Sequence, residues 1–106
     1  MLNPFIEKKS QQLINYVYGY FYGRIPYSEL HIFIWDTLEE WAHYKQHYPL
    51  ECSGQEQVFW HLLHQLEYWP EPYLLHDQQL RTNIQDCLSY LKGYGLAPAN
   101  CVGIRP

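Results

Sequence analysis

Charge is scarce in this sequence, and positive charge is the scarcest. Only 17% of the 106 residues are charged, and the net charge is −4 with the histidines neutral. The seven lysines and arginines are scattered along the chain. Because a protein that binds a phosphate backbone needs clustered cations to displace counterions, the composition argues against nucleic acid as a partner.

Long apolar runs and a paired set of cysteines are also missing. No stretch approaches the ~20 apolar residues that a transmembrane helix requires, and the first residues lack the basic and apolar regions of a signal peptide. The three cysteines, Cys52, Cys87 and Cys101, leave one thiol over in any intramolecular scheme. We therefore expect no membrane association, and a cytoplasmic location in which thiols stay reduced.

Aromatic residues, in contrast, are abundant. They make up 18% of the chain, with eleven tyrosines and four tryptophans, within a total of 47% hydrophobic residues. Each buried ring contributes about 150–250 Å² of contact surface, so a chain of this length can bury a core without a metal or a disulfide. The length fits one domain spanning residues 1–106.

Apolar residues recur at every third or fourth position in four blocks, which predicts four amphipathic helices. Capping residues, prolines and glycines bound these blocks at residues 3–23, 26–49, 53–70 and 77–93. The clearest start is the capping box at residues 53–56, where a serine is followed three residues later by a glutamate. Residues 71–73 are expected to form a turn.

The second block is the most apolar. Rings such as Phe33, Trp35 and Tyr44 widen its apolar arc to more than half of the helix circumference. A helix of this kind is nearly surrounded by its neighbours, so we expect it to be the central helix of the domain. Residues 96–106 contain two prolines and a glycine, and we expect them to form a non-helical strap that lies on the bundle through Leu96, Val102 and Ile104.

These patterns predict an all-α fold, a compact four-helix bundle-like domain with a non-helical C-terminal strap. The alternative is an α+β fold with an N-terminal aromatic hairpin of about residues 16–22 and 30–35, followed by three helices. Alternating tyrosines in the first segment and strand-preferring residues in the second favour this alternative.

A polar stripe on the second predicted helix raises the hypothesis of a metal site. Its Glu-x-x-His spacing is used by carboxylate-bridged di-metal bundles, and imidazole and carboxylate are suitable ligands for a divalent transition metal. The full candidate set, drawn from the second and third helices, is Glu40, His43, His47, His61 and His64. The simpler interpretation, which we favour, is that the stripe is the solvated side of an amphipathic helix.

A second hypothesis concerns rings that lie at or beyond the edges of the apolar stripes. Tyrosine and tryptophan are enriched at binding hot spots, so these rings form a candidate interface for a protein partner or a homodimer. The candidate residues are Tyr18, Tyr22, Trp35, Trp60, Tyr68 and Tyr73. The alternative is that a surrounded core needs rings on several sides.

Catalytic patterns are not visible. No serine has a Gly-x-Ser-x-Gly context, and no glycine-rich phosphate loop is present. We therefore expect a non-enzymatic protein-interaction or regulatory domain. The alternatives are a metal-binding protein or small metalloenzyme, and a binder of apolar small ligands in an enclosed pocket between helices.

Overall fold

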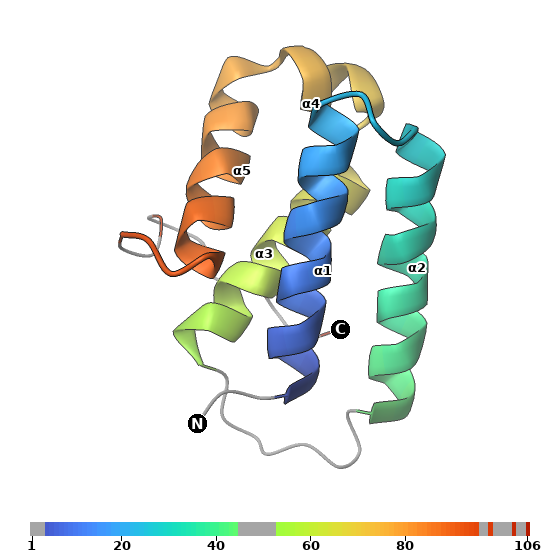
Figure 1. Cartoon of the computed structure of the whole chain (residues 1–106), viewed down its shortest axis with the longest axis vertical. Coiled ribbons are helices and arrows are strands. Elements are labelled where there is room, and N and C mark those ends of the chain that lie inside the picture. Colours follow the sequence, from blue (N-terminus) through green and yellow to red (C-terminus); the bar gives the residue numbers. More distant parts are fainter. Residues whose placement is uncertain (1–3, 45–52, 96–97, 99–102, 104–105) are drawn as a thin grey trace.

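All regular secondary structure in the part of the chain that the structure describes is helical. The computed structural model describes residues 4–44 and 53–95, together with residues 98, 103 and 106. Its helices are α1 (Pro4–Phe21), α2 (Tyr27–Tyr44), α3 (Gly54–Tyr68), α4 (Glu71–His76) and α5 (Gln78–Leu91) (Figure 1). No strand occurs in these ranges, so the all-α prediction is confirmed. The alternative hairpin is wrong, because its two segments lie in α1 and α2.

The helix ends follow the capping signals in the sequence. Ser53 Oγ accepts a hydrogen bond at 3.1 Å from the backbone N–H three residues on, at the start of α3. Asp77 Oδ1 accepts the equivalent bond at 2.8 Å at the start of α5. Gly23 and Gly93, which follow α1 and α5, have φ angles of 74° and 98°. These left-handed conformations suit glycine and allow the chain to leave a helix abruptly.

Helix α4 corrects the prediction of a turn at residues 71–73. It has six residues, and Pro72 lies in its first turn, where the missing N–H removes no helical hydrogen bond. Leu74 is buried in the core, and the Tyr20 hydroxyl of α1 donates to Glu71 Oε2 at 2.8 Å. Burial and this carboxylate raise the pKa of Tyr20 well above its ordinary value, which keeps the phenol protonated as the donor.

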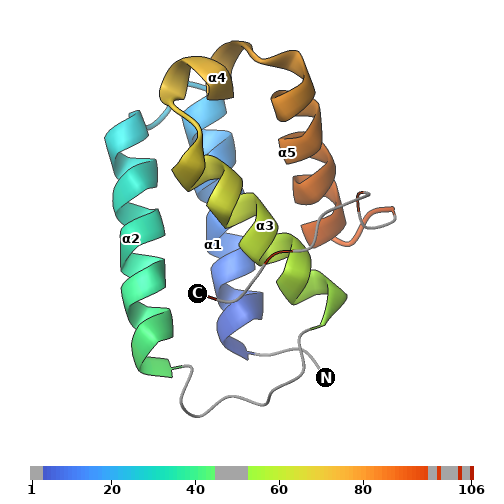
Figure 2. The same cartoon turned by 180° about the vertical axis from the view of Figure 1, so that it is seen from behind.

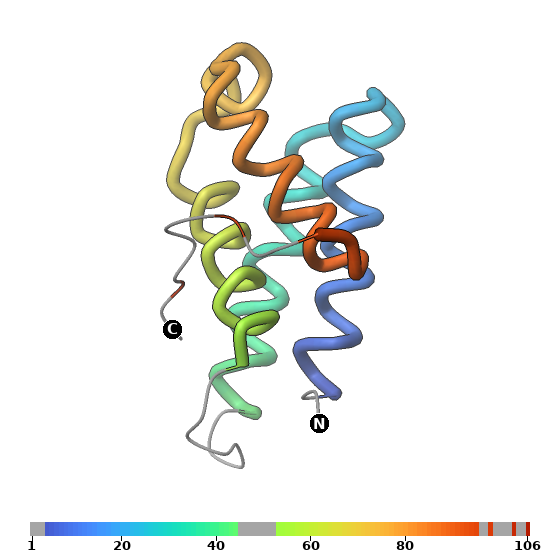
Figure 3. Tube along the Cα trace, turned by 90° about the vertical axis from the view of Figure 1, so that its left-hand side faces the viewer, coloured from blue at the N-terminus to red at the C-terminus, as the bar shows by residue number. Residues whose placement is uncertain are grey.

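The helices are arranged around α1 and α3. Seen from one side, α1 lies between α5 and α2 (Figure 1), and from behind, α3 crosses the bundle obliquely (Figure 2). Figure 3 shows α5 running diagonally down from α4 toward the lower half of α1. The largest fully buried side chains come from all five helices and include Ile6, Leu13, Leu30, Trp41, Phe59, Trp60, Leu74 and Ile84. None of the described helices is long and apolar enough to cross a bilayer.

Helix α2 lies at the edge of the bundle, so the prediction that it is central is wrong. It packs mainly against α1 and α3, and both views show it on the outside (Figures 1 and 2). Those two neighbours cover only the face that carries Leu30, Ile34 and Trp41. The rest of its broad apolar arc has no described helix against it, and Ile32 and Trp35 are each 54% exposed.

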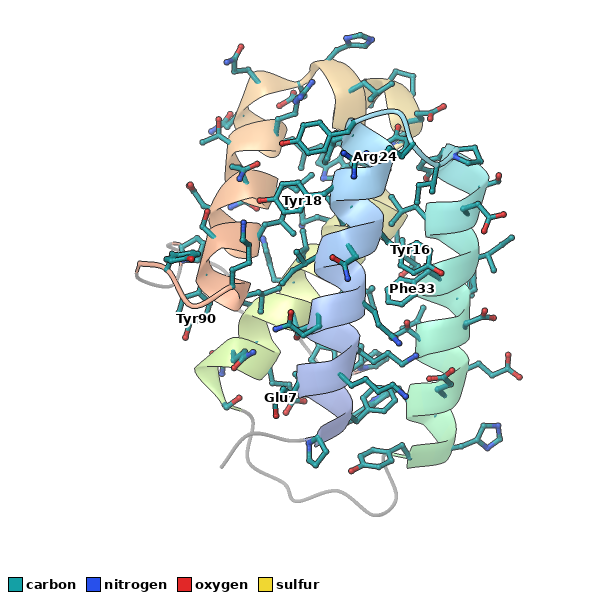
Figure 4. All side chains as sticks on the ribbon, in the orientation of Figure 1. Glu7, Tyr16, Tyr18, Arg24, Phe33 and Tyr90 are labelled. Atoms are coloured by element: carbon teal, nitrogen blue, oxygen red, sulfur yellow. The ribbon has the colours of Figure 1, made fainter. Side chains whose placement is uncertain are left out.

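The contact between α1 and α2 combines stacked rings with an ion pair. Tyr16 and Phe33 point toward each other between the two helices (Figure 4), with ring centroids 4.4 Å apart. Lys9 Nζ lies 2.6 Å from Glu40 Oε2. The lysine is largely buried and the glutamate is exposed at the edge of the interface. This ion pair links α1 to the side of α2 that carries Glu40.

The predicted C-terminal strap is confirmed at its described residues, which are non-helical. The backbone N–H of Gly103 donates to the carbonyl oxygen of Gln57 in α3 at 3.0 Å. A Cβ at Gly103 would collide with the α3 backbone, that carbonyl oxygen lying 2.6 Å away, so the approach requires glycine. Trp41 Nε1 donates to the carbonyl oxygen of Pro106 at 3.3 Å. The predicted contacts of Leu96, Val102 and Ile104 lie outside the described residues.

Candidate functional site

The described members of the predicted metal set on α2, Glu40 and His43, lie on the exposed side of that helix. Glu40 is engaged with Lys9 of α1 rather than with a histidine. His43 is exposed near the C-terminal end of α2, and His47 lies outside the described residues. The helical spacing places Glu40 and His43 one turn apart, as expected, but the neighbouring helix supplies a cation to the carboxylate.

The two histidines of α3 diverge. His61 faces α5, where its Nε2 lies within hydrogen-bond distance, 3.0 Å, of Asn83 Oδ1. His64, one turn further along, has other partners: its Nδ1 lies 3.9 Å from Glu67 Oε2, and its ring lies beside that of Trp60. In the described parts of the chain, no three His, Cys, Asp or Glu side chains group to hold a metal ion.

Trp60 corrects the list of candidate interface residues, because it is 0% exposed. Its ring centroid lies 5.0 Å from that of Trp41, and its indole N–H donates to the buried Glu56 carboxylate at 2.9 Å. The sequence indicated one apolar stripe on α3, but this helix contacts α1, α2 and α5. A helix with three neighbours needs apolar side chains on several sides, so Trp60 belongs to the core.

The other five candidate rings lie in three separate places. Tyr18 and Tyr22 stack on α1 with centroids 5.8 Å apart, and Trp35 stands on α2. Tyr68 and Tyr73 lie on either side of Trp69, where α3 meets α4. All of these rings are exposed except Tyr18 and Trp69, which are half-buried. The chain therefore does not gather them into one aromatic patch.

Positive charge accompanies the rings of α1. Lys92 Nζ lies 4.9 Å from the Tyr18 ring centroid and donates to its hydroxyl at 3.2 Å. Arg24 lies 6.0 Å from the Tyr22 ring, and the labelled side chains of Tyr18 and Arg24 can be followed in Figure 4. Burial raises the pKa of Tyr18, but the hydrogen bonds from Gln85 and Lys92 outweigh it and lower that pKa overall. This surface is cationic and aromatic.

Helix α2 presents the opposite charge. Its sequence contains no lysine or arginine, and its two large exposed apolar side chains, Ile32 and Trp35, alternate with exposed carboxylates. We call the surface formed by Glu29, Ile32, Trp35, Asp36 and Glu39 the outer face of α2. Within the described residues, no ion pair engages its three carboxylates. The outer face of α2 is therefore apolar at its centre and acidic at its margins.

Trp35 is held in place by a column of rings along α2. Tyr27 and His31 stack with ring centroids 5.5 Å apart, and His31 meets Trp35 edge-on at 6.1 Å. These side chains are one turn apart, which is the spacing at which neighbours on a helix touch. A large exposed ring supported in this way offers apolar area at a low cost in side-chain entropy.

Comparison with protein-family models, with curated proteins and with solved structures finds no match for this chain. The candidate site therefore rests on the geometry of the outer face of α2. Sequence reasoning identified Trp35 but not Ile32. The sequence pattern that could have identified Ile32 is the row of acidic residues at positions 29, 36 and 39. These residues alternate with apolar residues that lie outside the main apolar stripe.

Proposed function

We propose that this protein is an interaction domain in which the outer face of α2 docks a basic, amphipathic helical segment of another protein. The observation that carries the proposal is the pairing of Ile32 with Trp35, two large apolar side chains that are both more than half exposed and lie one turn apart. Contiguous exposed apolar surface is typical of binding sites, and tryptophan is the residue type most enriched at hot spots.

The margins of the outer face favour a basic partner. Glu29, Asp36 and Glu39 surround the apolar centre, and α2 supplies no cation to neutralise them. Complementary charge speeds association and suppresses wrong partners. An amphipathic helix matches this face because its apolar stripe can lie along Ile32 and Trp35 while flanking lysines or arginines reach the carboxylates.

A second copy of the chain suits this face less well, which favours a different protein over a homodimer. A two-fold dimer brings the same patch of both subunits together. The acidic margin of one copy, formed by Glu29, Asp36 and Glu39, would then approach the acidic margin of the other. Like charges brought together at an interface cost several kcal/mol, so the proposed complex is heteromeric.

We also propose the cytoplasm as the compartment in which the protein acts. The odd number of cysteines leaves at least one thiol outside any intramolecular disulfide. A reducing compartment protects such thiols from intermolecular oxidation.

Fluorescence anisotropy with a labelled peptide tests the proposed function. The peptide has the length of α2, with leucine at positions i, i+3, i+4 and i+7 and lysine elsewhere. We expect saturable binding that weakens as NaCl is raised from about 0.1 M to about 1 M, because the screening length falls from about 10 Å to about 3 Å.

The matched control is a peptide with the same leucines and with glutamate in place of every lysine. We expect it to bind much more weakly than the basic peptide. Equal binding of both peptides would show that the acidic margins play no part. Absence of binding by the basic peptide would overturn the proposal.

A further inference from the structure

We propose a second binding site, which takes a neutral sugar ring, in the pocket between α3, α4 and α5. The pocket has a volume of about 490 Å³ and opens to solvent, and sites for small ligands are about 300–1,000 Å³. Its walls are formed mainly by His61, Gln65, Trp69, Tyr73, Gln79 and Asn83. The mixed lining differs from the enclosed apolar pocket that the aromatic composition suggested.

Two rings form the apolar wall of this pocket. Trp69 and Tyr73 contact each other with ring centroids 5.5 Å apart and planes inclined at 48°. The indole N–H of Trp69 donates to Gln65 Oε1 at 2.8 Å, which fixes the orientation of the larger ring. Because the rings touch at an angle, they leave no parallel slot for a planar nucleobase. They offer a bent apolar surface on which the C–H groups of a saturated ring can lie.

The rest of the lining is polar and links two helices. A hydrogen bond between His61 Nε2 and Asn83 Oδ1, 3.0 Å apart, joins α3 to α5 at the pocket. Side-chain amides at Gln65, Gln79 and Asn83 line the same space. An amide has both a donor and an acceptor group, and a hydroxyl can donate and accept at once. A ligand with several hydroxyl groups around an apolar ring therefore matches both walls.

The charge of the lining favours a neutral ligand. No lysine or arginine is among the described residues that line the pocket, so a phosphate or carboxylate would find no permanently charged side chain to pair with there. The single carboxylate belongs to Asp77, whose Oδ1 accepts the N–H of Leu80 as the cap of α5. That carboxylate can accept a bond from a hydroxyl, as the amide oxygens can.

Saturation-transfer NMR with glucose, galactose, N-acetylglucosamine and maltose at millimolar concentration tests the site on the intact protein. We expect transfer to the ring protons of at least one of these sugars, and a Kd that rises about tenfold in Tyr73→Ala and in Gln79→Ala. Both residues are exposed, so these variants should stay folded. Tyr22→Ala, which removes a still more exposed ring just after α1, should leave binding unchanged.

Three results would overturn this proposal: transfer to none of the four sugars, equal binding by Tyr73→Ala and the unchanged protein, or tighter binding of adenosine or glucose 6-phosphate than of every neutral sugar. The site lies on the α5 side of α3, away from the outer face of α2. Tyr73→Ala should therefore bind the basic peptide normally, which separates the failure of this inference from the failure of the proposed function.

Discussion

Replacing Trp60 with alanine is expected to lower the free energy of unfolding by about 3–5 kcal/mol, the usual cost of removing a buried aromatic ring. The Trp60 side chain is completely buried, and its ring packs against Trp41 and Phe59. The substitution also removes the hydrogen bond that its indole donates to the buried Glu56 carboxylate, which adds to the loss because hydrogen bonds to charged groups contribute more than neutral ones. Denaturant unfolding followed by circular dichroism measures the change.

Trp35→Ala is the matched control for this measurement, because it removes the same side chain from an exposed position. We expect it to lower the free energy of unfolding by less than about 1 kcal/mol, as surface substitutions do. A similar loss in both variants, or a larger loss for Trp35, would contradict the placement of one ring in the core and the other on the surface.

The largest functional effect is expected for Trp35→Ser. This variant should weaken binding of the basic amphipathic peptide by about 30-fold or more, which corresponds to a hot spot of about 2 kcal/mol. Trp35 is the largest exposed apolar side chain on the outer face of α2, and His31 supports it edge-on. Anisotropy titration of the folded variant gives the ratio of dissociation constants directly.

Tyr22→Ser supplies the comparison for Trp35→Ser. Tyr22 is also a large exposed ring, but it lies just after α1 beside Arg24, where a basic peptide meets positive charge. Its substitution should leave the affinity within about twofold, as expected for a residue outside the interface. If Tyr22→Ser weakened binding as strongly as Trp35→Ser, the outer face of α2 would not be the docking surface.

The ends of the long helices could be predicted because capping is local chemistry. Ser53 and Asp77 bond to a backbone N–H three residues away, and Gly23 and Gly93 need only their own backbone freedom. Such interactions involve residues that are close in sequence, so the sequence is sufficient to locate them.

The position of a helix within the bundle could not be predicted in the same way. The broad apolar arc of α2 indicated a surrounded helix, but α1 and α3 are the helices that each contact the other three long helices. Helix α4 is too short to show a periodic pattern, and the contacts that anchor it, through Leu74 and Glu71, reach distant parts of the chain. These arrangements depend on tertiary packing, which a periodic pattern does not encode.

The candidate metal site shows the same limit. Helical spacing placed Glu40 and His43 on one rim, and His61 and His64 on one helix. The neighbour that each residue meets is a tertiary feature: Lys9 pairs with Glu40, Asn83 bonds to His61, and Glu67 lies near His64. Spacing within a helix thus predicts which residues share a face and leaves open what that face contacts.

The most direct test of docking on α2 is the NMR footprint of the basic peptide on the labelled protein. We expect the largest amide shift changes in α2 around Ile32 and Trp35, and small changes around Tyr18 and Tyr22 on the cationic surface of α1. Changes that gather on α1 and α5, or that spare α2 while the peptide binds, would contradict the assignment of the outer face of α2 as the interaction site.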